Sequence, residues 1–178
     1  MTAAAIKARI RTIPDFPKQG IQFRDITTLL ADGEGLAMAV SALADMARGT
    51  QVDAVAGIEA RGFIFGSALA IALGTGFIPL RKAGKLPVET IGEDYALEYG
   101  TARLELDPGL ISEGERVLLL DDLLATGGTA IAGAKLLRRA GAIVERAVFV
   151  VDLPELGGRQ ALAGHDLAVE AVVSFEGH

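Results

Sequence analysis

The segment from Val117 to Thr129 constrains the fold of this chain more than any other part of the sequence. It begins with the apolar run Val117–Leu120, which predicts a buried strand. Two adjacent carboxylates, Asp121 and Asp122, follow the strand, and a glycine-rich turn then opens a helix over residues 130–139. A strand that leads through a glycine turn directly into a helix is typical of α/β domains with a parallel sheet.

Short apolar runs and helical periodicity alternate along the rest of the chain. We expect strands at 52–58, 76–80, 101–106, 147–151 and 168–173, and helices at 35–48 and 63–73. Residues 15–28 contain Pro17 and Gly20 and have no period, so we expect them to be irregular. The sequence contains no linker or repeat, and 178 residues are enough for one domain with a full core. It therefore predicts a single α/β domain over residues 1–178, with a mainly parallel sheet flanked by helices.

Three polar segments each follow a predicted strand directly: residues 59–62, 81–85 and 121–129. Ligands of open α/β sheets bind outside the carboxyl ends of the strands. Because the carboxyl ends of parallel strands meet at one edge, we expect these three segments to lie close together.

Residues 125–129, which we call the glycine loop, have the chemistry of a site for a single phosphate. Gly127 and Gly128 allow backbone N–H groups to approach an oxyanion closely, and the following helix N-terminus adds unpaired donors. No Lys-Ser/Thr pair follows, so the loop is not a P-loop, and it lacks the G-x-G-x-x-G of a dinucleotide site. A bare Asp-Asp pair would more often be a capping or solvated pair. The complete strand-to-helix context favours the phosphate site instead.

Residues 81–99 combine charged residues, glycines and Pro87 without a period. A segment of this length in a compact domain is usually a lid or a binding loop, although a solvated surface loop is an alternative. We expect it to be mobile between Lys82 and Tyr95 without a ligand and ordered with one, because its cations need an anion to hold them.

Composition excludes several classes of function. The net charge of −6 argues against a nucleic-acid partner, which needs a broad basic surface. The chain has no cysteine, and its only histidines are His165 and His178, so we expect no zinc site and favour a hard ion such as Mg²⁺. Residues 63–80 carry no charge, but Gly74 and Pro79 interrupt them, so we expect no membrane span. Without an apolar leader at the N-terminus, we expect a cytoplasmic protein.

The string from Val117 to Thr129 resembles the phosphoribosyl pyrophosphate (PRPP) motif of the type I phosphoribosyltransferases, in its adenine-specific form. The likeness continues, in the same order, over most of the chain. It includes Phe16-Pro17, Phe23-Arg24-Asp25, Glu59-Ala60-Arg61-Gly62-Phe63, Arg81-Lys82, Gly84-Lys85-Leu86-Pro87 and Leu97-Glu98-Tyr99-Gly100. The resemblance implies the type I phosphoribosyltransferase fold, with an N-terminal hood over about residues 1–34 and a flexible lid loop over about 81–99.

The resemblance also implies roles at the PRPP site. Asp121 and Asp122 would hold the ribose hydroxyls and face the positive charge that develops at the anomeric carbon. The 5′-phosphate would lie in the glycine loop, against Ala125, Thr126, Gly127, Gly128 and Thr129. Pyrophosphate would be bound by Glu59, Ala60, Arg61, Arg81, Lys82 and Lys85, with a cis peptide between Glu59 and Ala60. Mg²⁺ would be held mainly through PRPP.

The implied adenine site involves Gln22, Phe23, Arg24 and Leu123. Phe23 and Leu123 would cover the two faces of the base, and backbone groups of Gln22 and Arg24 would read its edge. Phe23 could instead be a simple core anchor, because lone aromatic residues usually just bury area. Gln22 departs from the aliphatic residue that is usual in the family. Glu98 would handle the proton of the base, with a surface ion pair as the alternative.

The implied activity transfers the phosphoribosyl group of PRPP to adenine, giving AMP and pyrophosphate. The chain has Ala125 where the 6-oxopurine enzymes carry an aspartate, which disfavours another purine as substrate. A regulator that senses PRPP without turnover is a further alternative, but the chain adds neither a DNA-binding domain nor a basic face. The resemblance implies a homodimer, with adenine and PRPP as small-molecule partners and no nucleic acid or membrane.

Overall fold

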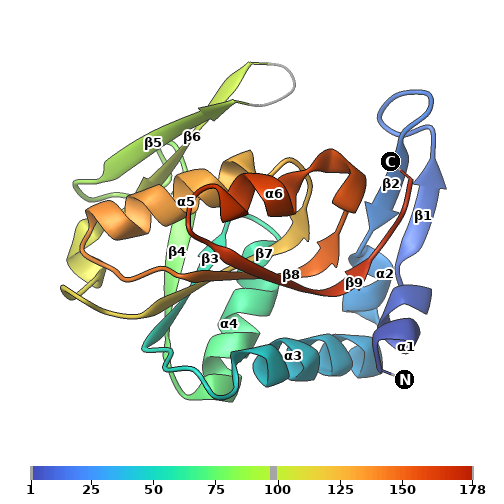
Figure 1. Cartoon of the computed structure of the whole chain (residues 1–178), viewed down its shortest axis with the longest axis horizontal. Helices are drawn as coiled ribbons and strands as arrows, with labels where there is room; N and C mark the ends of the chain where they lie inside the picture. The colour runs from blue at the N-terminus through green and yellow to red at the C-terminus, as the bar shows by residue number, and fades with distance from the viewer. Residues whose placement is uncertain (1, 97–99, 178) are drawn as a thin grey trace.

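A seven-stranded sheet forms the centre of the computed structural model, which describes residues 2–96 and 100–177 (Figure 1). The strand order is β5-β6-β4-β3-β7-β8-β9. Five neighbouring strands are parallel, namely β4, β3, β7, β8 and β9, and β6 runs antiparallel to both β4 and β5. The strands span β3 (Ala54–Ile58), β4 (Gly76–Lys82), β5 (Ile91–Ala96), β6 (Thr101–Leu106), β7 (Val117–Leu124), β8 (Arg146–Asp152) and β9 (Ala168–Ser174). The predicted α/β fold with a mainly parallel sheet is confirmed.

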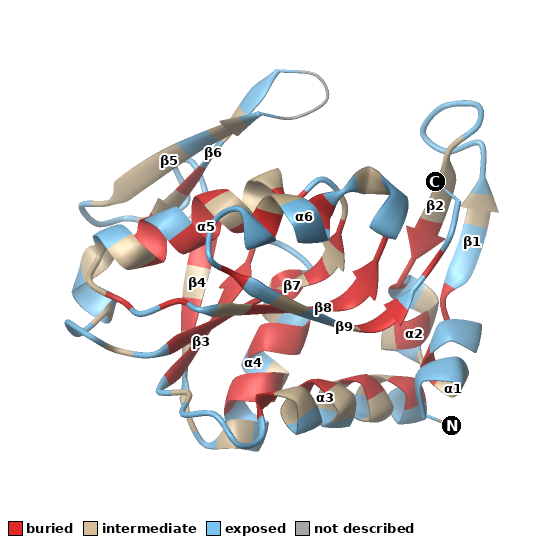
Figure 2. Ribbon diagram, viewed as in Figure 1, coloured by how far each residue is buried: buried red, intermediate tan, exposed pale blue. Residues whose placement is uncertain are grey.

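Helices cover both faces of the sheet. One face packs against α5 (Gly128–Arg139) and α6 (Gly158–Ala163), and the other packs against α1 (Thr2–Ala8), α3 (Gly33–Ala47) and α4 (Gly62–Leu73). Two short 3-10 turns, η1 (Pro108–Leu110) and η2 (Pro154–Leu156), follow β6 and β8. Figure 2 shows that the buried residues concentrate on the central strands and on the helix faces turned toward them. Each face of the sheet therefore has its own hydrophobic core.

The strand β7 is longer than the apolar run predicts. It continues to Leu124, so Asp121 and Asp122 belong to the strand. Leu124 pairs with Asp152 of β8, and this neighbouring strand keeps the backbone extended beyond Leu120. Both carboxylates are therefore fixed by the sheet.

Residues 15–28 were expected to be irregular, and this prediction is wrong in part. The strands β1 (Arg11–Pro14) and β2 (Gln22–Asp25) form an antiparallel hairpin, and α2 (Thr27–Ala31) follows. These strands have four residues each and carry polar side chains at most positions, so they show no alternation. The contact that pairs them at one end, Arg11 Nη2 to Asp25 Oδ2 at 2.5 Å, joins residues that are distant in sequence.

The expectation of an irregular segment over 81–99 is also wrong in part. Arg81 and Lys82 end β4, and residues 91–96 form β5, which pairs along its whole length with β6. Glu93 lies on the face of β5 that packs against α5, where it forms ion pairs with Lys135 (3.5 Å) and Arg139 (3.1 Å). Because a charged residue occupies an inward-facing position of β5, the sequence does not show the alternation of polar and apolar residues by which a strand is recognised. The cations that pair with this carboxylate belong to α5.

No helix in the described ranges is long and apolar enough to cross a membrane. The uncharged stretch 63–80 is divided between α4 and β4. Gly74 ends α4 in the left-handed conformation, with φ of 69°. The predicted break at this glycine is confirmed.

Candidate active site

The three polar segments that follow strands meet at one edge of the sheet, as predicted. Arg61, which precedes α4, places its Nε 2.9 Å from Oδ2 of Asp122 on β7. At the end of β4, Arg81 Nε lies 3.0 Å from Oε2 of Glu59. The same Glu59 oxygen accepts a hydrogen bond from the backbone N–H of Lys82 at 2.9 Å. These contacts join β3, β4 and β7 at their carboxyl ends.

The two aspartates of β7 form a strained electrostatic pair. Asp122 is buried, and Asp121 is partly buried with its Oδ1 accepting a hydrogen bond from the Asp122 N–H at 2.8 Å. Burial, and after it the charge of Asp122, raises the pKa of Asp121 well above its ordinary value. Burial also raises the pKa of Asp122, and the Arg61 cation opposes this effect. The pair is therefore a place where a positive charge would be strongly stabilised.

Arg61 is poised between this pair and solvent. Its side chain is 43% exposed, and its contact with Asp122 lacks hydrogen-bond geometry, because Oδ2 of Asp122 has no hydrogen-bond partner in the described part of the chain. An arginine held by charge alone can turn toward an anionic ligand without breaking a hydrogen bond.

The segment 59–62 approaches β7 very closely. A Cβ on Gly62 would lie 2.8 Å from Oδ1 of Asp121, so only glycine fits there without displacement. The peptide between Glu59 and Ala60 is cis, as the resemblance implied. Arg81 and the Lys82 N–H lower the pKa of Glu59. The Glu59 carboxylate is thus an internal partner that orients Arg81, while Lys82 and Lys85 are exposed.

The glycine loop is built to accept hydrogen-bond acceptors. The N–H groups from Thr126 to Thr129 donate no hydrogen bond to any residue that the structure describes. Gly127 adopts a left-handed conformation with φ of 87°, and a cavity of about 80 Å³ lies against the loop, Asp121 and Phe149. Free donors at a helix N-terminus around a small cavity form an anion site.

The end of β5 reaches this loop. A Cβ on Gly128 would lie 3.4 Å from the carbonyl oxygen of Ala96, the last described residue of β5. The predicted residue Glu98 belongs to 97–99 and lies outside the described residues. Its neighbours in sequence therefore place the hairpin, but not its side chain, at the glycine loop.

The predicted base-site residues divide into two groups. Phe23 is partly exposed and packs edge-on against Phe16, with ring centroids 5.1 Å apart, so it is not an anchor of the buried core. Gln22 and Leu123 are also partly buried. The Arg24 side chain, in contrast, is buried and donates to Thr12 Oγ1 at 2.6 Å and to the backbone oxygens of Glu176 and Gly177. The Arg24 guanidinium is therefore committed to contacts within the protein.

Comparison with known proteins identifies the family. Residues 27–166 match the family described as "Phosphoribosyl transferase domain". The chain belongs to the phosphoribosyltransferase family. This match contains the aspartate pair, the glycine loop and the segment 59–62.

Named relatives of this phosphoribosyltransferase are similar to it over nearly their full length. The chain is 60% identical to an adenine phosphoribosyltransferase of Erythrobacter litoralis (strain HTCC2594), with all of both chains covered. The crystal structure of the Thermoanaerobacter pseudethanolicus adenine phosphoribosyltransferase is 47% identical, has a TM-score of 0.92 and covers 97% of this chain and 99% of that one. The Saccharomyces cerevisiae enzyme, solved with an imino-altritol bisphosphate and adenine, is 35% identical with a TM-score of 0.89, and 96% of this chain and 98% of that one are covered.

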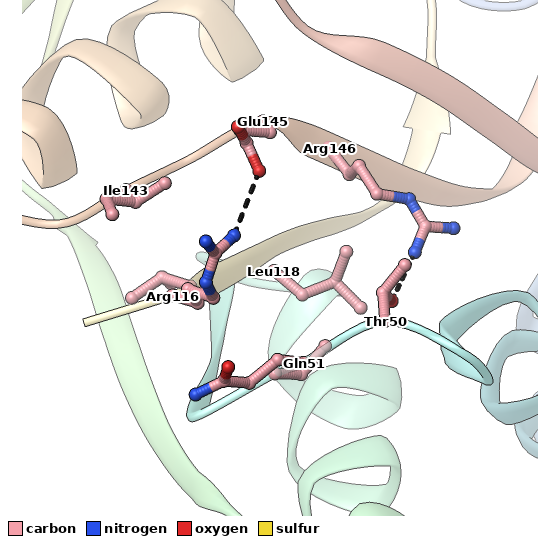
Figure 3. A pocket seen from close by; sticks show the side chains of 9 residues that line it. Thr50, Gln51, Arg116, Leu118, Ile143, Glu145 and Arg146 are labelled. Atoms are coloured by element: carbon pink, nitrogen blue, oxygen red, sulfur yellow. Dashed lines mark hydrogen bonds and ion pairs between the residues drawn. The ribbon is translucent and has the colours of Figure 1, made fainter. Parts of the chain in front are cut away.

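A larger cavity of about 290 Å³ lies at the opposite, amino ends of the strands (Figure 3). Arg146 donates there to Thr50 Oγ1 at 2.6 Å, and Arg116 Nη1 lies 3.2 Å from Glu145. Its arginines already have partners, and none of the predicted phosphoribosyltransferase site residues lines it. This cavity is therefore separate from the candidate active site.

Sequence analysis missed one contributor to the site. Gly158, at the start of α6, lies directly behind the glycine loop, 33 residues further along the chain than Ala125. The only signal was the Gly157-Gly158 pair after a predicted strand, and a glycine pair more often marks an ordinary turn.

Proposed function

We propose that this chain transfers the 5-phosphoribosyl group of PRPP to adenine, forming AMP and releasing pyrophosphate in purine salvage. The observation that carries the proposal is the adjacency of the Asp121–Asp122 pair on β7 and the free N–H groups of the glycine loop that follows this strand. Full-length identity of 60% to a named adenine phosphoribosyltransferase supports adenine as the acceptor.

PRPP carries phosphate groups at two ends, and the site offers donors for each. The 5′-phosphate binds in the glycine loop, from Ala125 to Thr129. Pyrophosphate binds at Ala60, Arg61, Arg81, Lys82 and Lys85, with Glu59 holding Arg81 in place. Each close pair of opposite charges contributes about 4 kcal/mol at an effective dielectric of 20. These local cations offset the overall negative charge of the protein.

The reaction exchanges one bond at the anomeric carbon for another. The carbon–oxygen bond to pyrophosphate breaks, and pyrophosphate leaves with the electron pair, while a ring nitrogen of adenine forms the new bond. Positive charge builds on the ribose in between. Asp121 and Asp122 face this charge and hold the ribose hydroxyls, so their mutual repulsion is relieved as the transition state forms.

Mg²⁺ fits this site as a companion of the substrate. The described residues contain no group of three or more potential metal ligands. Two adjacent carboxylates are a small oxygen donor set, which suits an ion that takes most of its ligands from phosphates and water. Asp121 and Asp122 would face the ion, and when bound it neutralises charge on the departing pyrophosphate.

Adenine recognition uses the hood hairpin and β7. Phe23 stacks on one face of the base and Leu123 packs on the other, while the backbones of Gln22 and Arg24 read its edge. Glu98 accepts the proton that the imidazole side of adenine must lose. The position of Ala96 beside Gly128 supports a hairpin tip that delivers Glu98 to the base.

We also propose a cytoplasmic homodimer, with a second copy on the outer face of α4. This helix has no charged residue over its twelve positions, yet Ile71 is 82% exposed and Ile64 is 41% exposed. A helix that is apolar all round is normally buried. Ile71→Glu should therefore yield monomers by sedimentation, and Ile71→Val should remain dimeric; a dimer in both variants contradicts this face.

One assay tests the proposed reaction. Purified protein receives PRPP, Mg²⁺ and, in turn, adenine, hypoxanthine, guanine or xanthine, and nucleotide formation is measured. We expect AMP from adenine and no product from the oxopurines. Product from an oxopurine would support the other-purine alternative, and PRPP binding without any product would support a regulator.

A further inference from the structure

The first turn of α6 packs directly against the back of the glycine loop. A Cβ on Gly158 would lie 2.3 Å from the carbonyl oxygen of Ala125 and 2.7 Å from Leu124 Cδ1. The first of these atoms belongs to the backbone, which cannot rotate away as a side chain can. The position of the Ala125 peptide is therefore set by the absence of a side chain at Gly158.

A second contact repeats this arrangement one step further along the loop. A Cβ on Gly127 would lie 2.4 Å from Cδ1 of Leu162, a fully buried residue of α6, and 3.2 Å from the Gly158 oxygen. The loop thus rests on α6 at two points. At each point one of the two residues in contact is a glycine, which allows the loop and α6 to approach this closely.

The start of α6 is itself fixed to the end of β8. Nε of Arg159 lies 2.5 Å from Oδ2 of Asp152, a carboxylate that is only 1% exposed, and Arg159 Nη1 donates to the Val169 oxygen at 2.9 Å. The Leu153 N–H donates to the Leu124 oxygen at 3.0 Å, which ties the chain after β8 to the residue before the loop. The first turn of α6 is therefore held in place by strands of the central sheet.

We propose that Gly158 and Leu162 are positioning residues for PRPP, which hold the glycine loop in the conformation that binds the 5′-phosphate. They touch no substrate and act through the backbone of Ala125 and Gly127. This inference rests on the proposed function, because it takes the glycine loop as the 5′-phosphate site. It assigns to α6 an effect on one end of the substrate, since the close contacts of Gly158 and Leu162 described above are with Leu124, Ala125 and Gly127.

The test is a glycine-to-alanine comparison in the full chain. Gly158→Ala should raise the KM for PRPP and the inhibition constant of ribose 5-phosphate by about 10-fold or more. A 10-fold rise corresponds to a loss of ~1.4 kcal/mol in binding free energy, which is a modest part of what several hydrogen-bond donors contribute to binding a phosphate. The KM for adenine and the inhibition constant of pyrophosphate should change by less than about 2-fold. This split between ligands is the decisive readout, because a general loss of stability would not select the 5′-phosphate.

Two matched controls separate positioning from packing. Gly164→Ala at the other end of α6 meets nothing closer than 3.4 Å and should leave all constants unchanged. Gly133→Ala overfills the core against Leu80 Cδ1 at 2.9 Å and should lower only the melting temperature. If Gly158→Ala does not fold, Leu162→Val replaces it, with an expected rise of about 3-fold in the same two constants.

Thr126→Ala distinguishes the two ways in which the idea can fail. If Thr126→Ala weakens ribose 5-phosphate but Gly158→Ala and Leu162→Val do not, the positioning role is wrong and the loop assignment stands. If none of the three variants affects ribose 5-phosphate, the loop is not the 5′-phosphate site, and the positioning role falls with it. An equal loss for all ligands would also overturn the proposal, because it would indicate a packing role.

Discussion

The strand β7 and its glycine loop are held by close packing against glycines, whereas the two hairpins around them add ion pairs of partly exposed arginines to their strand pairing. Gly62 packs against Asp121, and Gly158 packs against Ala125, in contacts too close for any side chain. The hairpins depend on pairs such as Arg11–Asp25 and Arg139–Glu93, whose arginines are 58% and 51% exposed. Close packing fixes geometry, while exposed pairs contribute little and open easily. On the proposed function, the ribose would therefore bind where the protein is held most rigidly.

The largest effect should come from the fixed region. Asp121→Asn removes a negative charge without changing side-chain size, and on the proposed function this charge faces the ribose, so we expect kcat to fall by about 10²–10³-fold at saturating substrates. Asp53→Asn, at the amino ends of the same strands, is the control and should keep its turnover. Steady-state assays of both variants measure the difference. Retention of more than about a tenth of the activity by Asp121→Asn would contradict the electrostatic role.

Glu98 lies outside the described residues, and the proposed function gives its replacement an effect of a similar order. Glu98→Gln should lower turnover by at least ~100-fold and leave PRPP affinity nearly intact, because general acid–base help contributes about 10²–10⁴ in rate. Glu93→Gln on the same hairpin breaks only ion pairs and should retain most of its activity. If Glu98→Gln keeps more than about a third of wild-type turnover at saturating adenine, Glu98 is a surface ion-pair partner.

The hood hairpin should show its dependence on charge in its response to pH. Hydrogen bonds from Thr27 and Arg11 lower the pKa of Asp25 to about 2. A lowered pKa gives stability that is present above the unfolded value near 4 and is lost as the pH falls toward 2. Asp25→Asn should therefore reduce the free energy of unfolding by at most about 2 kcal/mol at pH 7. Urea unfolding at pH 7 and pH 3 measures the gap between the two proteins, which must narrow at the lower pH.

The smallest expected effect is a change in hydrogen exchange within the expected lid, and the structure narrows it to residues 83–90. Residues 91–96 are anchored by β6 and α5, so hydrogen exchange should be slow there with and without PRPP. Residues 83–90 lie between strands and should gain about 10-fold protection when PRPP binds. Equal protection of 83–90 in both states would remove the case for a ligand-ordered lid.

Sequence predicted the fixed region far better than the hairpins. The run Val117–Leu120 and the turn at Gly127-Gly128 carry their structure locally, because apolar character and glycine conformation are properties of those residues. The hairpins form through distant partners, such as Arg139 for Glu93, and no local pattern contains that information. The same reason explains why the burial of the Arg24 side chain was not predicted. Its partners are the backbone oxygens of residues 176 and 177, which are far away in the sequence.

The path of the Arg24 side chain also bears on the order in which the chain can fold during synthesis. Its partners Glu176 and Gly177 lie 152 and 153 residues later in the chain, and its guanidinium stacks 4.6 Å from the ring of Phe175. A ribosome releases the chain from the N-terminus onward, so residues 11–25 emerge long before the residues that hold them. Contacts of such long sequence separation form late, after the loop between them has closed. The β1–β2 hairpin is thus synthesised long before residues 175–177, and until these emerge only Thr12, among these partners, is available to the Arg24 guanidinium.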